Sequence, residues 1–341
     1  IADVGIDFLK QHSEENTEKP FFLYLAFTCP HFPLMAKPED IDRYRETYKI
    51  GWDEIRKQRY QRMLDIGLVD CKLSPLRPEV FASWSFPEEK LQEMIGLGEE
   101  AHAIPWNELT DVQKEYQATK MAIHAAMVDS MDQSIGRVLD YLEETGLDRN
   151  TWIIFMGDNG WFLGEHGFTS KVLPYEESMR VPMIVSHPSC AKQVDEHIVL
   201  NTDLTATIYD IAGVEPPCPL HGVSLLPLVA MKDDDSGVAE NANRSDVVWR
   251  EDFFYEAPTP VLGSWPTWAV RNARWKYIEV YQPNQMTEPT PGISRPNHRE
   301  LYDLLNDPHE MKNVIDAHPD IAETMRQRMA ELNAEITGTE K

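Results

Sequence analysis

The stretch TWIIFMGDNGWFLGEHGFTSKVLPYEESMRVPMIV, residues 151–185, decides the fold of this 341-residue chain. It begins with a mostly apolar run, Thr151 to Met156, and ends with a second one, Val181 to Val185. A short run without polar alternation suits a strand that is buried on both faces of a parallel sheet. Gly157 to Gly160, read as GDNG, stops the first run because glycine and asparagine favour turns. The stretch therefore predicts two buried strands joined by a polar loop.

Outside this stretch, further strands and helices are indicated. Residues 20–28, PFFLYLAFT, form another apolar run of strand length, which Cys29-Pro30-His31 stops. Residues 110–146 start with a capping-box pattern, keep helical spacing of apolar residues and end at a glycine, so they predict a long helix. A second helix is expected over 203–212. Strands alternating with helices predict an α/β fold, specifically a three-layer α/β/α sandwich with a mainly parallel sheet.

The C-terminal part of the sequence has a different character. An acidic stretch, residues 232–247, is expected to be a surface loop that separates an α/β domain at 1–231 from a subdomain at 248–341. The subdomain contains an alternating strand-like piece at 268–281 and an amphipathic closing helix at 321–336. These patterns predict a small α+β subdomain.

Composition narrows the classes of partner. With 57 acidic and 32 basic side chains, the formal charge is −25, which repels nucleic acid and anionic membranes. No apolar run reaches the roughly 18 residues that a membrane-spanning helix needs. The sequence has four cysteines, Cys29, Cys71, Cys190 and Cys218, and no two of them form a C-x-x-C pair. This spacing excludes zinc-ribbon and thioredoxin-type sites, but it does not decide whether the cysteines form disulfides. We therefore expect neither a nucleic-acid partner nor a membrane span.

Several residues that could perform chemistry follow the predicted strands. Ligand sites in α/β sheets lie beyond the carboxyl ends of the strands, where His31 and the pair Asp158-Asn159 are expected. Asp and Asn offer two hard oxygen ligands, which suit Ca²⁺ or Mg²⁺, although D-N-G is equally a favoured turn sequence. Lys171, in the glycine-bearing loop that also holds His166, could neutralise an anionic group or remain a solvated loop lysine.

Taken together, these segments resemble the sulfatase family of the alkaline-phosphatase superfamily. The resemblance includes 157–185 and PFFLYLAFTCPHFPLMAKPEDIDRY, residues 20–44. It continues at HGVSLLPL, residues 221–228, and ELYDLLNDPHEMKN, residues 300–313. It implies a hydrolase that converts a sulfate monoester to an alcohol or phenol plus inorganic sulfate. The implied substrate is a small-molecule or carbohydrate sulfate ester.

The resemblance also implies roles for individual residues. Asp158 and Asn159 match the pair with which the family binds a divalent metal, usually Ca²⁺, with Mg²⁺ as the other candidate. Lys171 and His31 match catalytic residues that contact the sulfate group, His31 near the leaving-group oxygen. His166 lies in the same loop as Lys171 and is a candidate for substrate binding. It ranks below Lys171 and His31 because the role of this histidine varies among members of the family.

One family feature is missing from the sequence. Sulfatases carry a Cys or Ser in a Cys-x-Pro-x-Arg motif, oxidised to the formylglycine nucleophile, and none of the four cysteines fits it. Ser74-Pro75-Leu76-Arg77 is only a near match, and the family's N-terminal Asp-Asp metal pair is absent. The chain therefore resembles the C-terminal portion of a sulfatase. The alternatives are a phosphodiesterase or phosphonate monoester hydrolase of the same superfamily, or a non-catalytic remnant. The compartment stays open: periplasmic or extracellular if the chain follows many bacterial sulfatases, with the cytoplasm not excluded.

Overall fold

A computed structural model of the protein describes most of the chain: residues 1–16, 18–73, 87–100, 104–163, 165–167, 169–229, 248–258, 265–281, 291–292 and 294–338. The chain forms two compact units, Ile1–Glu79 with Ser85–Trp152, and Val80–Trp84 with Ile153–Lys341. Each unit is described by itself below. The predicted boundary at 232–247 lies outside the described residues, so it stays a prediction.

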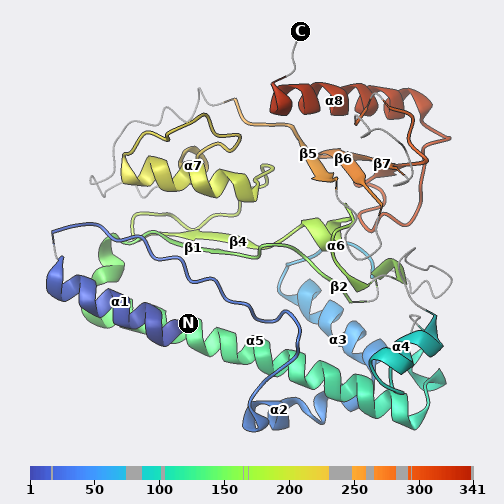
Figure 1. The fold of residues 1–341 in the computed structure, drawn as a ribbon, viewed down its shortest axis with the longest axis horizontal. Coiled ribbons are helices and arrows are strands. Elements are labelled where there is room, and N and C mark those ends of the chain that lie inside the picture. Colours follow the sequence, from blue (N-terminus) through green and yellow to red (C-terminus); the bar gives the residue numbers. More distant parts are fainter. Residues whose placement is uncertain are drawn as a thin grey trace. The chain divides into compact units, whose positions relative to one another are not determined.

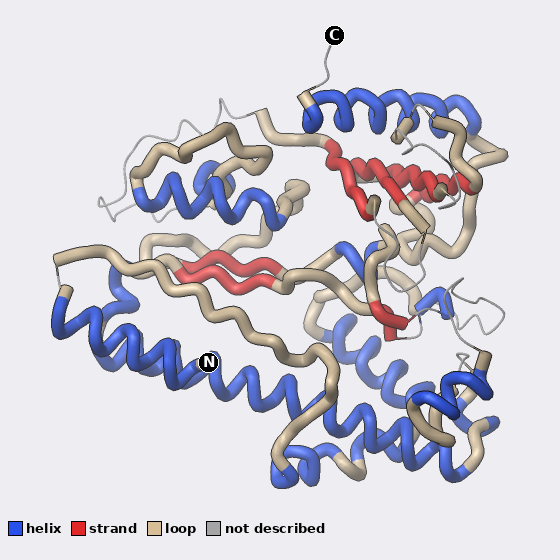
Figure 2. The backbone as a smooth tube through the Cα atoms, in the orientation of Figure 1, coloured by secondary structure: helices blue, strands red, loops and turns tan. Residues whose placement is uncertain are grey.

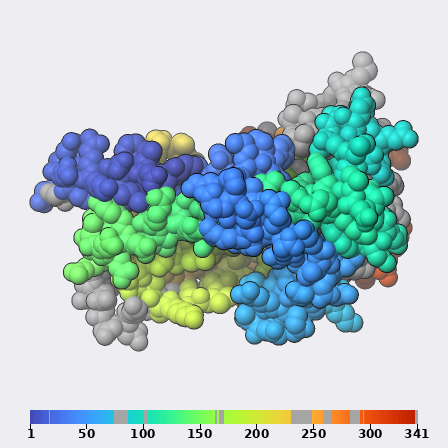
Figure 3. Space-filling model, turned by 90° about the horizontal axis from the view of Figure 1, so that it is seen from below, coloured from blue at the N-terminus to red at the C-terminus, as the bar shows by residue number. Residues whose placement is uncertain are grey.

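The first unit is built on one long helix, α5 (Asp111–Thr145). Thr110 and Gln113 form a capping box at its start, and Gly146 ends it in the left-handed conformation, which confirms the predicted helix. Helices α1 (Ala2–Glu15) and α2 (Pro38–Tyr44) pack on α5. Figure 3 shows α1 and α2 in blue on the green surface of α5. Small buried residues on α5 let the helices approach closely: Ala118, Ala122 and Ala126.

Shorter helices complete the first unit. They are α3 (Trp52–Asp65), α4 (Glu88–Met94) and the 3-10 turns η1 (Thr47–Ile50), η2 (Trp106–Glu108) and η3 (Leu147–Asn150). None of the described helices of the protein combines the length and apolarity that crossing a membrane requires.

The prediction of a strand at residues 20–28 is wrong. The segment runs extended without a strand ladder, and its side chains alternate between half-buried and exposed. Phe22 and Tyr24 are 71% and 77% exposed. An apolar extended segment becomes a strand only when a neighbouring backbone completes its hydrogen bonds, and no such ladder is present among the described residues.

In the second unit, the two strands predicted from 151–185 are present, but the prediction that they are buried on both faces is wrong, since Phe155 is 40% and Ile184 58% exposed. The strands are β1 (Ile153–Met156) and β4 (Met183–Ser186). The two strands lie side by side in Figure 1. They pair antiparallel, with Ile153 opposite Ser186. Between them lie a short ladder of β2 (Phe162–Leu163) and β3 (Thr169–Ser170), the turn η4 (Glu165–Gly167) and helix α6 (Glu176–Met179). The α/β class is confirmed, but every ladder among the described residues is antiparallel rather than parallel.

Helix α7 (Asn201–Ala212) follows β4 and confirms the helix expected there. It ends at Gly213 in the left-handed conformation, and the turn η5 (Leu226–Leu228) comes later. Asp203 in its first turn is fully buried and accepts two hydrogen bonds from Arg250, at 2.5 and 2.6 Å. This pair fixes α7 to the start of the C-terminal region.

The C-terminal region contains a four-stranded antiparallel sheet in the order β5-β6-β7-β8. The strands are β5 (Asp252–Ala257), β6 (Thr267–Asn272), β7 (Trp275–Val280) and β8 (His298–Asp303). Helix α8 (Pro319–Thr337) covers one face of the sheet (Figures 1 and 2). The strands at 268–281 and the closing helix are therefore present as predicted.

The two faces of this sheet have separate cores because side chains alternate along each strand. The face toward α8 is closed by apolar residues of the sheet and helix: Trp268, Val270, Tyr277, Leu301, Met325 and Met329. On the opposite face, Ala269, Ile278 and Tyr302 pack with Phe162 and Tyr175. The loop between β1 and β4 is therefore seated on the second face of the C-terminal sheet.

Candidate functional site

The end of β1 presents the two oxygen-bearing residues that were predicted to bind a metal. The chain bends at Asp158 and Asn159, and the Asn159 N–H donates to Asp158 Oδ1 at 2.9 Å. The Asn159 Nδ2 donates to the carbonyl of Gly160 at 2.8 Å. Asp158 is exposed and Asn159 is half-buried. This geometry is compatible with the turn interpretation as well as with the metal interpretation.

Gly160 has a steric reason to be glycine. A Cβ placed on it would lie 2.0 Å from the carbonyl oxygen of Glu177. The N–H of Gly160 also donates to the carbonyl of Ser178 at 2.8 Å. The close backbone approach therefore holds the bend at 158–160 against the start of α6.

Lys171 reaches this bend. Its Nζ donates to Asn159 Oδ1 at 3.0 Å and lies 5.7 Å from the centroid of the Trp161 ring. The side chain is half-buried. Both contacts are with uncharged groups, an amide oxygen and an indole face. The structure thus brings Asn159 and Lys171 together, which a solvated loop lysine would not show.

The residue after Lys171 has an unusual backbone. Val172 has φ of 90°, a conformation that costs a β-branched residue about 1–3 kcal/mol. Its N–H donates to Ser178 Oγ at 3.0 Å, and its carbonyl accepts from the Tyr255 hydroxyl at 2.6 Å. Burial raises the pKa of Tyr255, so this hydroxyl keeps its proton and remains a donor. The strained residue is held on both sides.

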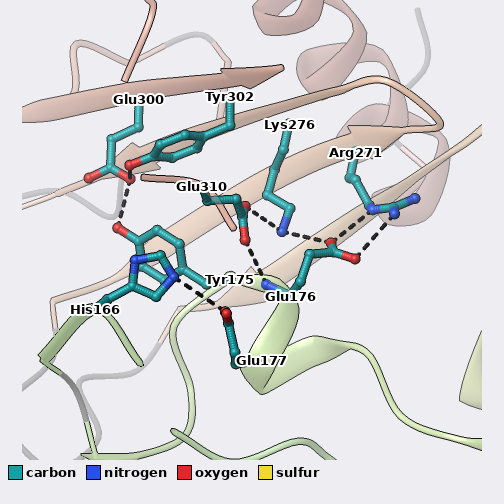
Figure 4. A network of polar contacts seen from close by, with 9 residues as sticks. All are labelled: His166, Tyr175, Glu176, Glu177, Arg271, Lys276, Glu300, Tyr302 and Glu310. Carbon is teal, nitrogen blue, oxygen red and sulfur yellow. Dashed lines mark hydrogen bonds and ion pairs between the residues drawn. The ribbon is translucent and has the colours of Figure 1, made fainter. Parts of the chain in front are cut away.

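A buried ionic network fixes the next residues of the loop (Figure 4). Lys276 Nζ lies 2.8 Å from Glu176 and 2.6 Å from Glu310, and Arg271 Nε lies 2.9 Å from Glu176. Both Lys276 and Glu310 have fully buried side chains. One Glu310 oxygen also accepts the backbone N–H of Glu176 at 2.7 Å. The network joins α6 to β6, β7 and the turn after β8.

The two carboxyl groups of this network differ in pKa. Burial raises the pKa of Glu310 to about 7, against the opposing effect of Lys276. Burial would also raise the pKa of Glu176, but Lys276 and Arg271 together outweigh it and lower this pKa to about 2. Glu176 is therefore the permanent anion, and Glu310 is the group that titrates near neutral pH.

His166 lies in the same loop but is buried within it. Its ring stacks on Tyr175 with centroids 4.9 Å apart, and Nε2 lies 3.3 Å from Glu177 Oε2. The Tyr175 hydroxyl donates to Glu300 at 2.8 Å, and burial raises the pKa of Tyr175 well above its ordinary value. These contacts place His166 where it supports the loop.

His31 belongs to the first unit. It is exposed, and its Nδ1 lies 2.8 Å from the carbonyl oxygen of Phe32, an acceptor, so Nδ1 carries the proton of this hydrogen bond. Its juxtaposition with Lys171, which belongs to the second unit, stays a prediction.

The chemical types of Asp158 and Asn159 suit a divalent cation. Asp158 and Asn159 offer a carboxylate and an amide oxygen, the hard donors that Ca²⁺ and Mg²⁺ prefer. Across the part of the chain that the structure describes, no group of three or more His, Cys, Asp and Glu residues could hold a metal. Asp158 and Asn159 would supply only part of a metal's ligand shell, and the metal site at this pair stays a prediction. The near match at Ser74 to Arg77 lies outside the described residues.

The anchoring residues of the loop were missed from the sequence. Tyr255, Lys276 and Glu310 lie far from Lys171 along the chain, and only the structure brings them to the loop. The segments YEES and NDPHE, which contain Glu176 and Glu310, stood within the stretches that resemble sulfatases, but no role was assigned to them. The position of Glu176 and Glu310 within these segments was the sequence signal that could have pointed to a role for them.

Comparison with known families identifies the class of protein. A family model described as Sulfatase matches residues 1–214, well over half of the chain. A second model, described as N-sulphoglucosamine sulphohydrolase, C-terminal, matches residues 164–335. The chain belongs to the sulfatase family.

Individual relatives agree with this assignment. An uncharacterized sulfatase of Schizosaccharomyces pombe is 29% identical, over 94% of this chain and 58% of the relative. An N-acetylglucosamine-6-O-sulfatase of Bacteroides thetaiotaomicron is 34% identical, over 57% of this chain and 32% of the relative. An arylsulfatase of Klebsiella aerogenes is 26% identical, over 63% of this chain and 51% of the relative. The chain thus spans less than two thirds of the length of these relatives.

Solved structures support the same fold. A structure in complex with its substrate, D-glucosamine-2-N,6-O-disulfate, has a TM-score of 0.63 at 22% identity, covering 97% of this chain and 68% of that one. A phosphonate monoester hydrolase of Agrobacterium radiobacter has a TM-score of 0.60 at 20% identity, covering 98% and 60%. The alkaline-phosphatase-like fold expected from the sequence is confirmed.

Proposed function

We propose that this chain forms part of a sulfatase that hydrolyses a sulfate monoester to an alcohol or phenol and inorganic sulfate. The observation that supports this most is the hydrogen bond from Lys171 to Asn159. In this hydrogen bond the Lys171 ammonium group lies beside Asn159, one of two adjacent residues with hard oxygen donors after the carboxyl end of β1. A cation of this kind next to a metal-ligand pair is suited to an anionic ester.

In this proposal each residue has a defined task. Asp158 and Asn159 would hold Ca²⁺, or Mg²⁺, and the bound cation would supply positive charge to offset the negative charge of the sulfate oxygens. Lys171 offsets negative charge on the transferring group as a point charge, and the Asn159 amide orients its Nζ. The formylglycine nucleophile is expected outside residues 1–341, since no cysteine of the chain stands in the required motif.

His31 is proposed to donate a proton to the departing oxygen. Because Nδ1 keeps its proton in the hydrogen bond to the Phe32 carbonyl, this donation would come from Nε2 of the doubly protonated ring, which returns to the neutral Nδ1–H tautomer as the proton leaves. For His166, the contacts with Tyr175 and Glu177 favour shaping of the loop over contact with substrate. A direct substrate contact of His166 stays the weaker part of the proposal.

For the substrate we propose a carbohydrate sulfate ester. One relative is an N-acetylglucosamine-6-O-sulfatase, and one structural neighbour contains a sulfated glucosamine. Small-molecule esters remain the competing class, because an arylsulfatase and a choline-sulfatase are also among the relatives. The test compares kcat/KM of the protein translated from the complete gene on glucosamine 6-sulfate and on an aryl sulfate. A preference for the aryl ester would contradict the carbohydrate assignment.

A second candidate activity is phosphonate monoester or phosphodiester hydrolysis. Two structural neighbours are phosphonate monoester hydrolases, with TM-scores of 0.60 and 0.59. A sulfate ester and a phosphonate ester of the same phenol separate the two activities, because the leaving group is then constant. Faster turnover of the sulfate ester is expected. Turnover of neither ester would support the non-catalytic alternative.

A further inference from the structure

We propose that Tyr255 is a positioning residue, which holds Lys171 in place by clamping the strained residue beside it. The proposal deepens the proposed function, because it rests on Lys171 as the residue that contacts the anion. Tyr255 lies on β5 of the C-terminal sheet, 83 residues after Val172 in the sequence. The proposal therefore gives this strand a role in the candidate site.

The first step of the argument is the backbone of Val172. A valine has no stabilising reason of its own to adopt φ of 90°, so the surrounding contacts must impose it. Glu310 and His166 are the other non-glycine residues with positive φ near this loop, but neither is directly bonded to Lys171. Relaxation of Val172 to negative φ would rotate the peptide group that follows Lys171.

The second step is the pair of hydrogen bonds that impose this conformation. Ser178 Oγ accepts from the N–H of Val172 at 3.0 Å, and the Tyr255 hydroxyl donates to its carbonyl at 2.6 Å. Ser178 is buried in α6, which the Glu176 network ties to the sheet, so its contact reaches Val172 only by way of that helix. Tyr255 belongs to the sheet itself, and its hydroxyl is therefore the contact that joins the Val172 carbonyl directly to a strand.

The third step separates the hydroxyl of Tyr255 from its ring. The ring packs, with Leu173 and Val280, against the core on the loop-facing side of the sheet. Replacement by phenylalanine keeps this packing and removes only the donor. Tyr255→Phe therefore tests the clamp without opening the core.

The experiment measures the reactivity of single lysines in the 341-residue chain with an amine-selective acylating reagent, followed by peptide mass spectrometry. In Tyr255→Phe, we expect the labelling rate of Lys171 to rise about fivefold, the effect of losing one hydrogen bond on a local equilibrium. The matched control is Tyr209→Phe, which removes a phenol hydroxyl from the half-buried Tyr209 of α7 and should leave the rate unchanged. An unchanged Lys171 rate in Tyr255→Phe overturns the proposal.

Two further readouts exclude a merely structural role. Lys276 is fully buried in the same unit, and equal increases at Lys276 and Lys171 would mean general loosening, which overturns positioning. In a Val172→Gly background, where positive φ is unstrained, Tyr255→Phe should change Lys171 labelling much less. Equal increments in both backgrounds would show that the hydroxyl does not act through Val172. The labelling is independent of substrate, so its failure is distinct from a failure of the proposed sulfatase activity.

Discussion

Two lysines in the second unit, Lys171 and Lys276, have opposite environments. Lys276 is fully buried between Glu176 and Glu310, so its charge is neutralised inside the protein. Lys171 is half-buried and contacts an amide oxygen and an indole face, and among the described residues no carboxylate forms an ion pair with it. A buried neutralised lysine ties elements together, whereas a lysine held by neutral groups keeps its charge for an external anion. We therefore propose that Lys276 serves the fold and that Lys171 serves the site.

The largest expected effect is on stability, at Lys276. Lys276→Met should lower the free energy of unfolding by about 3–5 kcal/mol, because it leaves buried carboxyl groups without their shared cation. Urea denaturation monitored by circular dichroism measures this loss. Lys312→Met, at an exposed position after β8, is the matched control and should change little. Equal free energies of unfolding for Lys276→Met and Lys312→Met would contradict the structural role proposed for Lys276, and with it the contrast between Lys276 and Lys171.

A smaller effect is expected from pH, through Glu310. Its pKa is about 7 in the folded protein and 4.5 in the unfolded chain, so between these values the folded state binds the extra proton. The contribution of Glu310 is therefore fully present below about pH 4.5 and is lost as pH rises through about 7. Glu310→Gln should flatten this fall, which is on the order of 1–3 kcal/mol.

Denaturation of Glu310→Gln and the unaltered protein at several pH values checks this. Glu323→Gln on α8, where the side chain is 52% exposed, serves as control and should retain the slope of the unaltered protein. Parallel pH profiles for the unaltered protein and Glu310→Gln would show that Glu310 is not the titrating group.

The smallest effect on stability is expected at Lys171. Lys171→Met loses one hydrogen bond of a half-buried side chain, so the free energy of unfolding should fall by only about 1 kcal/mol. Thermal denaturation beside Lys276→Met gives the comparison directly. A loss as large as that of Lys276→Met would assign Lys171 to the fold after all.

The sequence predicted those parts of the fold that have local signals. The capping box at Thr110 and the glycine at 146 bound the long helix, and the apolar runs at 151–156 and 181–185 became strands. The run at 20–28 looked the same but is not a strand, because strand formation depends on a partner backbone that local sequence does not specify. The antiparallel pairing of β1 and β4 was missed for the same reason.

The candidate site was predicted in part. The contact between Asn159 and Lys171 agrees with the residues chosen from the sequence, since both belong to one recognisable stretch. Its supports were not predictable, because the pairing of Glu176 with Lys276 joins segments 100 residues apart and depends on the tertiary fold. Nothing in the local sequence signals positive φ at Val172, a residue type that disfavours it.

The central claim, that Lys171 serves the anion rather than the fold, is tested most directly by kinetics. The measurement is kcat/KM for a sulfate ester with Lys171→Met and Lys37→Met variants of the protein translated from the complete gene, below both melting temperatures. Lys37 precedes α2 and is exposed, so its variant should retain full activity. Lys171→Met should lose about 10²- to 10³-fold, the usual cost of removing one preorganised group that stabilises transition-state charge. Equal kcat/KM for the two variants would contradict the account.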